Sequence, residues 1–346
     1  MPVARWMRRL AVAGVLLCFT VVVLGAYVRL TAAGLGCPDW PGCYGHLTPI
    51  GAEHSAAAQA AYADRPLALG KAWREMVHRY AAGTLGLVIL GVTALVISAR
   101  RRLRPVSVPF ALALLATVIV QGILGMLTVT WQLKPLIVTL HLLFGMTTLG
   151  LVWWLMLSLP RSSWGATALK SAGRAISGGG ASPIASAHQL ALVGLAALAV
   201  QTALGGWTSS NYAAVACLDF PTCQGAWWPH ADFHNAFVLW RGLNINYEGG
   251  VLDNPARVAI HLAHRLGALL TAVALTLAAL FVLRRRGLSG ARFRAWAVLG
   301  ALGLQLLIGI AMVLKAFPLW LATAHTAGAA LLLLATLALL RSLSVR

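Results

Sequence analysis

Charged residues are scarce in this sequence, and acidic residues are the scarcest of all. Only 10% of the 346 residues are Asp, Glu, Lys or Arg, and just eight of these are acidic, whereas 60% of the chain is hydrophobic. Soluble globular domains carry about a quarter charged residues, so this composition excludes that class. A chain so poor in charge is typical of a protein that lies within a lipid bilayer.

Eight apolar stretches are long enough to cross a bilayer as helices, which takes roughly 20 consecutive residues. The first follows Arg8 and Arg9 and could pass for a signal peptide, but no small-residue cleavage site comes after it, so we expect it to be retained. The sequence therefore predicts an all-α integral membrane protein with eight transmembrane helices. Their expected ranges are about 11–30, 78–98, 106–128, 136–159, 187–207, 258–283, 295–314 and 319–340.

The net charge of +19 would suggest a nucleic-acid partner in a soluble protein, but its distribution has another explanation. With the N-terminus in the cytoplasm, 17 of the 27 Lys and Arg residues fall in inner segments, and all eight acidic residues fall in outer segments. This is the positive-inside pattern of membrane proteins. We therefore expect a multi-pass protein of the cell (inner) membrane, with both termini cytoplasmic and no nucleic-acid partner.

The chain divides into two related halves. Each half is predicted to be a four-helix bundle, the two being tandem and pseudo-symmetric. The N-terminal half covers 1–161 with a long outer loop at 31–75, a Gly/Ser-rich cytoplasmic linker covers 162–186, and the C-terminal half covers 187–346 with an outer loop at 208–257. At an offset of 180 positions, Leu24, Gly25, Cys37, Asp39, Pro41, Cys43 and Gly45 match Leu204, Gly205, Cys217, Asp219, Pro221, Cys223 and Gly225. At an offset of 186, His78 and Arg79 match His264 and Arg265. At an offset of 184, Gln121, Gly125 and His141 match Gln305, Gly309 and His325.

Four of the five cysteines form two C-x₅-C pairs, Cys37 with Cys43 and Cys217 with Cys223, one in each outer loop. The outer side of the membrane permits disulfides, whereas the cytosol does not. Two interpretations stay open: a structural staple that orders a long loop, or a redox-active pair that exchanges with a thiol partner. Zinc is disfavoured because neither loop offers a second pair at zinc-finger spacing.

Four of the ten histidines share one location, because each begins an even-numbered helix at a similar depth below the outer surface: His78, His141, His264 and His325. A lone histidine on an apolar helix is usually a packing residue, but four at one depth, two in each half, indicate function. Paired histidines on facing helices suit an octahedral iron with two axial imidazoles. The sequence therefore predicts a haem between the second and fourth helices of each half.

The residues beside these histidines differ between the halves. Glu75 lies three residues before His78, one turn nearer the outside, whereas the matching residue of the second half is His261. A carboxylate that faces the iron pocket could act as a general acid or base, and an exposed charge at the start of a helix is the alternative. This difference between Glu75 and His261 predicts that the N-terminal half carries out the reaction and that the C-terminal half holds a permanent cofactor. Arg79 and Arg265 directly follow the first histidine of each half and could bind haem propionates or lie at the membrane interface.

The motifs GAYVRLT at 25–31, CPDWPGC at 37–43 and EMVHR at 75–79, together with the second cysteine pair and the later histidines, resemble the haem A synthase family over essentially the whole chain. The resemblance implies oxidation of the C8 methyl group of haem O to a formyl group, through successive hydroxylations and loss of water. It implies a haem b held by His264 and His325, substrate haem O facing His78 and His141, and Glu75 as the catalytic carboxylate. It also associates the loop cysteines with a disulfide.

The resemblance implies as partners haem O, haem O synthase, cytochrome oxidase assembly factors, membrane lipid and an electron donor that the sequence does not identify. A homo-oligomer is compatible with the sequence. Two other functions stay open. The first is a bis-histidine di-haem b electron-transfer cytochrome of the membrane, in which both sites are permanently filled. The second is a membrane thiol oxidoreductase centred on the cysteine pairs.

Overall fold

The computed structural model describes residues 2–99, 107–159 and 183–344, and within these ranges the chain is built of α-helices. Eight of the helices described there are long and apolar enough to cross a membrane. The predicted all-α class of an eight-span integral membrane protein is therefore confirmed. The eight helices are α1 (Pro2–Leu30), α4 (Leu69–Ser98), α5 (Val108–Thr130), α6 (Pro135–Ser158), α7 (Pro183–Ser210), α9 (Asn254–Arg284), α10 (Arg292–Leu314) and α11 (Leu319–Ser344).

Several helices extend beyond the apolar stretches that predicted them, α1 and α4 by nine residues each at their start. The extension of α4 positions part of the candidate site. Helix α4 begins at Leu69, nine residues before its expected start at His78. Hydropathy finds only the apolar part of a helix, and this first part carries the charged Lys71 and Glu75. It is held in place because Ala72 and Met76 pack beneath the first disulfide loop. The two long loops are shorter than predicted as a result, and they cover 31–68 and 211–253.

Short helices interrupt these loops and the turn between α9 and α10, where hydrophobic periodicity predicted none. They are too short to show a repeating apolar face, which is the signal that sequence periodicity needs. The predicted linker at 162–186 lies outside the described residues except for its last four positions, which form the start of α7. The short elements are α2 (Pro49–Glu53), α3 (Ala56–Ala61), η1 (Ala214–Ala216), α8 (Phe233–Ala236) and η2 (Arg286–Ala291).

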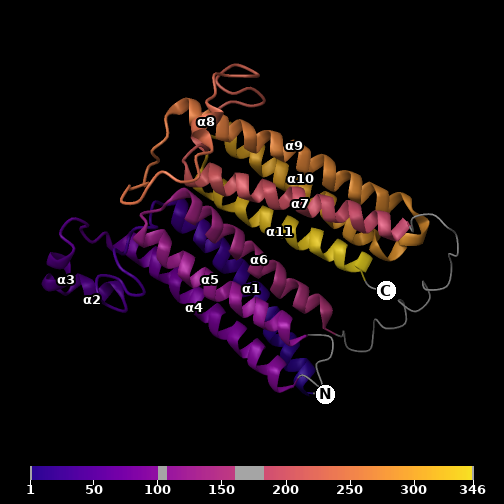
Figure 1. Ribbon diagram of the computed structural model, residues 1–346, viewed down its shortest axis with the longest axis horizontal. Helices are drawn as coiled ribbons and strands as arrows, with labels where there is room; N and C mark the ends of the chain where they lie inside the picture. Colours follow the sequence, from indigo (N-terminus) through magenta and orange to yellow (C-terminus); the bar gives the residue numbers. More distant parts are fainter. Residues whose placement is uncertain (1, 100–106, 160–182, 345–346) are drawn as a thin grey trace.

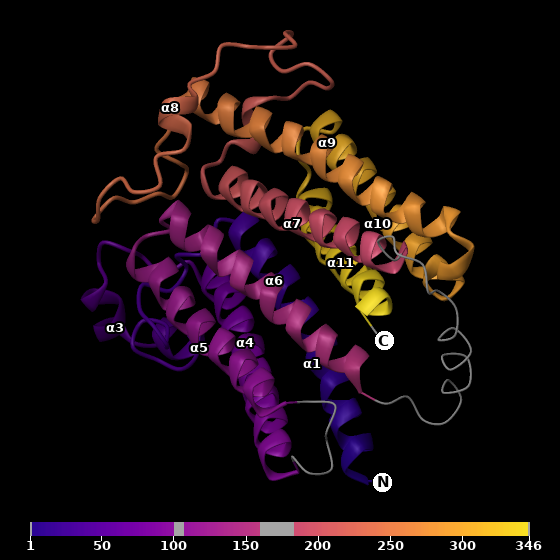
Figure 2. The ribbon, with the colours of Figure 1, turned by 45° about the vertical axis from the view of Figure 1, so that its right-hand side comes forward.

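The helices pack in two sets of four with the same pattern of neighbours. In the first set, α1 packs against α4 and α6, and α5 also packs against both. In the second set, α7 packs against α9 and α11, and α10 also packs against both. The sets meet where α6 and α1 contact α7 and α11. Figures 1 and 2 show them side by side, with the long loops at one end of the molecule, here called the loop end, and both termini near the other.

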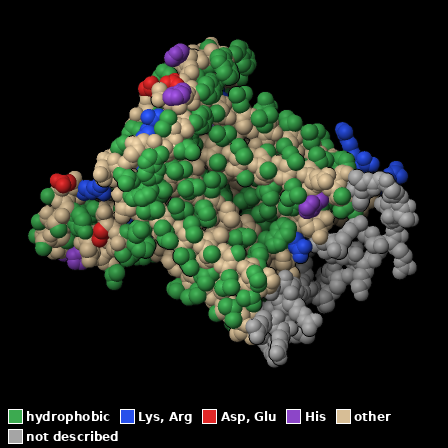
Figure 3. Space-filling model, viewed as in Figure 1, with side chains coloured by type: hydrophobic (Ala, Val, Ile, Leu, Met, Phe, Trp, Pro, Cys, Tyr) green, Lys and Arg blue, Asp and Glu red, His purple; other side chains and the backbone are tan. Residues whose placement is uncertain are grey.

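Aliphatic side chains fill the interior of each set. One cluster gathers around Ile89 of α4 and Leu149 of α6. The other gathers around Leu275 of α9 and Leu332 of α11. Figure 3 shows that hydrophobic side chains also cover much of the outer surface over the helices, while charged groups lie towards the ends. An apolar outer surface of this kind suits lipid, because a helix that is hydrophobic all round is either deeply buried or membrane-spanning.

The two sets also share their tight turns. The turn between α5 and α6 holds Gln132 and Leu133 at φ 49° and 61°, and the turn between α10 and α11 holds Ala316 and Phe317 at φ 56° and 59°. These residues stand 184 positions apart, although their side chains are unrelated. Residues other than glycine rarely adopt this left-handed conformation. The backbone path therefore repeats more faithfully than the sequence does.

The loop of the second set reaches across to the first set and holds it through Lys134. This lysine, in the turn between α5 and α6, is only 1% exposed. Its Nζ donates a hydrogen bond to the carbonyl of Gly242 and lies 3.2 Å from the ring centroid of Trp240. Next to it, the Tyr247 N–H donates to the carbonyl of Gln132 at 3.0 Å. The ammonium group is therefore satisfied by the opposite half of the molecule.

Replacing Lys134 should loosen this contact between the halves. We expect Lys134→Ala to destabilise the protein by about 2 kcal/mol, since a desolvated cation–π contact is worth roughly that much and the Gly242 carbonyl also loses its donor. The midpoint of thermal unfolding in detergent measures the effect. Lys315→Ala is the matched control, because Lys315 lies exposed in the corresponding turn of the second set and should leave the midpoint unchanged. Equal midpoints for both variants would contradict the role of Lys134.

Candidate functional site

The four histidines singled out by the sequence lie at corresponding places in the structure. His78 of α4, His141 of α6, His264 of α9 and His325 of α11 each follow the loop-end start of their helix by six to ten residues. At 1.5 Å per residue, this places them roughly 9–15 Å along the helix from the loop end. All four side chains are half-buried. They therefore share one level inside the apolar part of the molecule.

Each of these rings lies against a glycine on a neighbouring helix. A Cβ added to Gly25 would come within 3.0 Å of His78 Cε1, and one added to Gly205 within 3.2 Å of His264 Cε1. These contacts are tighter than most Cβ contacts in proteins, so even an alanine would require the imidazole to shift slightly. The same relation joins Gly125 with His141 at 3.4 Å and Gly309 with His325 at 3.0 Å. The sequence marked these glycines only as repeat positions, and their pairing with the histidines shows why they stand there.

The two histidines of each half come together from separate helices. The rings of His264 and His325 lie with their centroids 6.5 Å apart and their planes at 75°. His78 and His141 lie close enough to interact electrostatically. The structure therefore brings together the pairs that the sequence proposed, on α4 with α6 and on α9 with α11.

Glutamine amides contact the rings of the second half, and sequence reasoning missed this role. Gln201 of α7 places its Nε2 3.0 Å from Nδ1 of His264, and Gln305 of α10 places its Nε2 3.3 Å from the ring of His325. An amide –NH₂ can only donate, so Nδ1 of His264 accepts in this contact and the proton of the neutral ring lies on Nε2. The Nε2 of Gln305 lies 3.3 Å from both ring nitrogens of His325, so these contacts orient the two rings but do not by themselves free a ring nitrogen for a metal. Gln305 had been noted only as a repeat position. Gln201 carried no signal in the sequence, because the corresponding residue of the first half is Val21.

The histidines of the first half lack such partners. Nδ1 of His78 and Nδ1 of His141 are both buried without a hydrogen bond. Gln121 donates to the backbone carbonyl of His141 at 3.0 Å and not to its ring. A buried polar atom left without a partner costs roughly 1–3 kcal/mol. Two neutral nitrogen donors in each half, half-buried in apolar surroundings and held against glycine backbone, fit a porphyrin iron.

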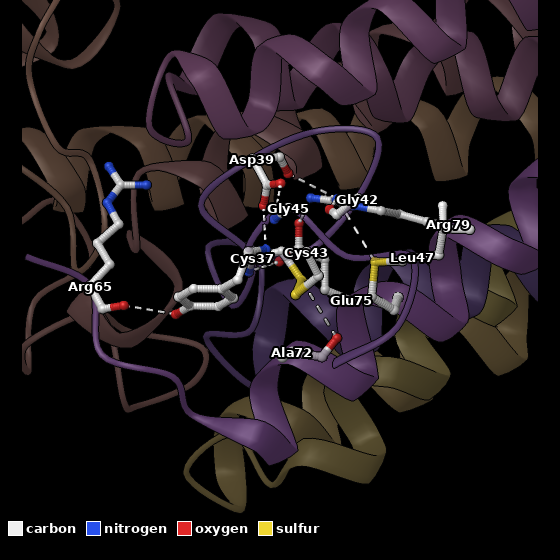
Figure 4. Close-up of a disulfide and its surroundings, with 12 residues drawn as sticks. Cys37, Asp39, Gly42, Cys43, Gly45, Leu47, Arg65, Ala72, Glu75 and Arg79 are labelled. Atoms are coloured by element: carbon white, nitrogen blue, oxygen red, sulfur yellow. Dashed lines mark hydrogen bonds and ion pairs between the residues drawn. A yellow bond between two sulfur atoms is a disulfide. The ribbon is translucent and has the colours of Figure 1, made fainter. Parts of the chain in front are cut away.

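Glu75 does not stand free in a pocket. It is 4% exposed, and its Oε2 accepts a hydrogen bond from the backbone N–H of Cys37 at 2.8 Å. Its Oε1 pairs with Arg79 Nη2 at 2.5 Å. Figure 4 shows the carboxylate beneath the disulfide loop, between that loop and Arg79. Glu75 is thus a buried, paired charge one turn from His78, which excludes the alternative of an exposed charge at a helix start.

Both arginines that follow the histidines bind the disulfide loop of their own half. Arg79 donates to the carbonyl of Asp39 at 3.0 Å and also to that of Gly42. Arg265 donates to the carbonyls of Asp219 and Thr222, each at 2.8 Å. The second arginine makes these contacts without a carboxylate partner. Contact of either arginine with haem propionates stays a prediction.

His261, which replaces Glu75 in the second half, has a different environment. It is 4% exposed, and its ring meets the edge of Phe317 in the turn between α10 and α11, with centroids 6.3 Å apart. Its Nδ1 is buried without a partner. It therefore does not supply the carboxylate that Glu75 supplies in the first half.

The cysteine pairs are disulfides, as the resemblance implied. Cys37 and Cys43 are joined, as are Cys217 and Cys223, and the Cα atoms of each pair lie 4.8 Å apart. All four cysteines are at most 1% exposed. Thiol exchange requires an accessible sulfur for the attacking thiolate, so this burial favours the structural staple.

Comparison with known proteins gives one consistent family. The model of the COX15-CtaA family, described as cytochrome oxidase assembly protein, matches residues 8–337. The haem A synthase of Shewanella oneidensis is 41% identical over 334 residues, which cover 95% of this chain and 93% of that protein. The haem A synthase of Paracoccus denitrificans is 31% identical over 89% of this chain and 80% of its own length. The haem A synthase of Beijerinckia indica is 29% identical over 99% of this chain and 93% of its own length.

The family match spans the eight helices, both disulfide loops and all four of the glycine-packed histidines described above. This chain therefore belongs to the COX15-CtaA family of cytochrome oxidase assembly proteins.

Proposed function

We propose that this protein is a haem A synthase, a membrane enzyme that oxidises the C8 methyl group of haem O to a formyl group. The observation that carries the proposal is the pair of glycine-packed histidines in each half, in a chain 41% identical to a haem A synthase over 95% of its length. Two successive hydroxylations of the methyl group followed by loss of water give the formyl product. The enzyme is then an oxidoreductase that acts on a CH/CH3 group.

The C-terminal half holds the permanent cofactor, haem b, through His264 and His325. The closeness of the two rings supports this assignment, because their centroids lie 6.5 Å apart on facing helices and the amides of Gln201 and Gln305 contact both rings. A haem bound there supplies one-electron redox chemistry. The protein itself orients the rings, excludes water through its apolar walls and keeps the imidazoles neutral in a medium where a charge would be costly.

The N-terminal half binds the substrate haem O at His78 and His141. Their unpaired Nδ1 atoms support a site whose occupant changes, because no side chain of the described residues donates to or accepts from these two atoms. Glu75 is the catalytic carboxylate of this half. It lies one helical turn from His78, and its pairing with Arg79 stabilises the ionised form of the carboxylate. The hydrogen bond from Cys37 couples that carboxylate to the loop above the site.

The molecule is a tandem duplication in this proposal, with its loops outside the membrane and both termini in the cytoplasm. The matched packing of the two helix sets and their matched turns support the duplication. The excess of Lys and Arg at the termini and inner turns supports the orientation in the cell (inner) membrane. The domains are then 1–161, the linker 162–186 and 187–346. Haem O synthase, which supplies the substrate, cytochrome oxidase assembly factors and an electron donor are the partners.

A di-haem electron-transfer cytochrome is the second candidate. The observation that favours it is the similarity of the two sites, because the glycine contact recurs in both halves. The third reading, a thiol oxidoreductase, is disfavoured by the burial of all four disulfide cysteines. A haem A synthase and a di-haem cytochrome differ in one property. In the synthase, one of the two porphyrin sites exchanges its haem, whereas in the cytochrome both sites stay filled.

The porphyrins that co-purify with the protein test the proposal. When haem O synthase is co-expressed, we expect chromatography of the extracted haems to show haem b together with haem O or haem A. A di-haem cytochrome would yield haem b alone and no haem A. That second result would overturn the synthase proposal.

Replacing an iron ligand of the C-terminal half should remove the tightly bound haem. We expect His264→Ala to lose the visible spectrum of haem b while the protein still inserts into the membrane, because the haem would lose one of the two histidines proposed to hold it. His188→Ala is the control, since His188 lies near the far end of the bundle and bonds to Ser344 at 3.1 Å. A His264→Ala protein with an unaltered spectrum would refute the assignment.

Neutralising Glu75 should stall the reaction without emptying the haem sites. Glu75→Gln can still accept the hydrogen bond from Cys37 but loses the charge that pairs with Arg79, so we expect bound haem to persist and haem A output to fall at least tenfold. Glu53→Gln, at an exposed position of the same loop, is the control. Unchanged haem A output from Glu75→Gln would count decisively against a catalytic Glu75. If the variant lost thermal stability but still produced as much haem A, the only role of Glu75 would be to hold the disulfide loop in place.

A further inference from the structure

The disulfide loop between α7 and α8 exposes large apolar side chains that its own fold does not cover. Trp227 is 76% exposed and Trp228 is 66% exposed, and Leu218 and Phe220 beside the disulfide are exposed as well. Single exposed apolar residues are ordinary, but four large ones between Leu218 and Trp228 of one loop indicate a contact surface. At the positions of the first half that correspond to the two tryptophans stand Leu47 and Thr48, so the aromatic pair belongs to the second loop alone.

This exposure is fixed by the rigidity of the loop. The Cys217–Cys223 disulfide closes it, and the N–H of Cys223 bonds to the carbonyl of Ala226 immediately before the tryptophans. Arg265 of α9 binds two carbonyls of the same loop. The ring of Trp228 also stacks on Phe233 of α8, with centroids 6.0 Å apart. A loop held at so many points cannot turn its apolar side chains inward.

The loop also presents almost no charge. From Ala214 to Ala231 the one residue with a formal charge is Asp219. Its carboxylate accepts hydrogen bonds from the Thr222 hydroxyl at 2.6 Å and from the N–H groups of Gln224 and Gly225 at 2.7 and 3.0 Å. These bonds, that of Thr222 first, lower the pKa of Asp219 to about 2. The carboxylate is therefore turned into the loop and leaves an apolar outer face.

The place of the loop connects this face with the lipid-facing surface. Figures 1 and 2 both show the loop projecting to the side of the bundle from the loop end of α9. Below it, Leu266, Leu269 and Leu270 of α9 are exposed on the membrane-spanning part of that helix. Figure 3 shows hydrophobic side chains continuing from the helices onto this projection. The apolar face of the loop is therefore continuous with a surface that lipid covers.

We propose that Trp227 and Trp228 lie in the lipid–water interface of the leaflet at the loop end, so that the second disulfide loop is anchored to the bilayer. Tryptophan suits this position because its ring is apolar and its indole N–H still reaches water or headgroups. The anchor holds the loop end of α9 through Arg265, next to His264 in the chain. The proposal rests on the membrane-spanning fold and not on the proposed enzymatic function.

Fluorine NMR of the full-length protein labelled with 5-fluorotryptophan and reconstituted in lipid nanodiscs tests the anchor. Trp227→Phe and Trp228→Phe assign the two signals by their loss and preserve an apolar ring at each position. A phospholipid with a nitroxide on its headgroup should broaden both signals, whereas a water-soluble gadolinium chelate should broaden them weakly. Trp296, exposed on membrane-spanning α10, is the control on the lipid side. Trp240, half-exposed in the loop above the first half, is the control on the water side.

Three outcomes would overturn the anchor. Broadening by the soluble chelate to the level of Trp240, with no effect of the nitroxide lipid, would place the pair in water. Protection from both agents would mean that protein covers the surface. Protection that disappears when nanodiscs hold a single copy of the chain would identify the cover as a second copy.

Discussion

The bilayer offers no hydrogen-bond partner to a polar group, and the rest of this structure depends on that constraint. It requires the backbone to be helical across the membrane. It also makes a buried polar side chain costly unless that side chain finds a partner within the protein. Thr93 bonds back to the carbonyl of Ile89, and Thr148 bonds to that of Phe144 in the same way. The Nδ1 atoms of His78, His141 and His261 are among the buried polar atoms that have no such partner.

The same constraint explains how the two halves come to differ while keeping one fold. Glycine opposite each histidine preserves the space in both halves, so the geometry of the two sites stays alike. What differs is the set of polar partners. The second half has Gln201 on the ring of His264, and the first half has Val21 at that place and Glu75 beneath its loop. These two exchanges in the polar partners are the difference on which the proposed division into a cofactor half and a reacting half rests.

The disulfide loops have a structural role that follows from their charges. In each half an aspartate accepts N–H groups from within the loop, and an arginine from the helix below binds the loop carbonyls. The loop is therefore joined to the helix that carries the first histidine of that half. In the first half the same arginine also pairs with Glu75. The carboxylate of Glu75 and the disulfide loop are consequently held by the same arginine. A change to either one should displace the other.

The sequence by itself determined the all-α membrane class, the eight helices and the histidines, because long apolar runs and repeated residue types are local signals. It could not give the start of α4 at Leu69, since a polar first turn is stable only when Ala72 and Met76 pack beneath a distant loop. It could not find the contact of Gln201 with His264, which joins residues 63 positions apart. It could not place Glu75 on the N–H of Cys37 or Lys134 under Trp240, because a buried charge is defined by the partner that the folded chain brings to it. Composition and spacing fix what must be buried, and tertiary structure alone decides which groups meet there.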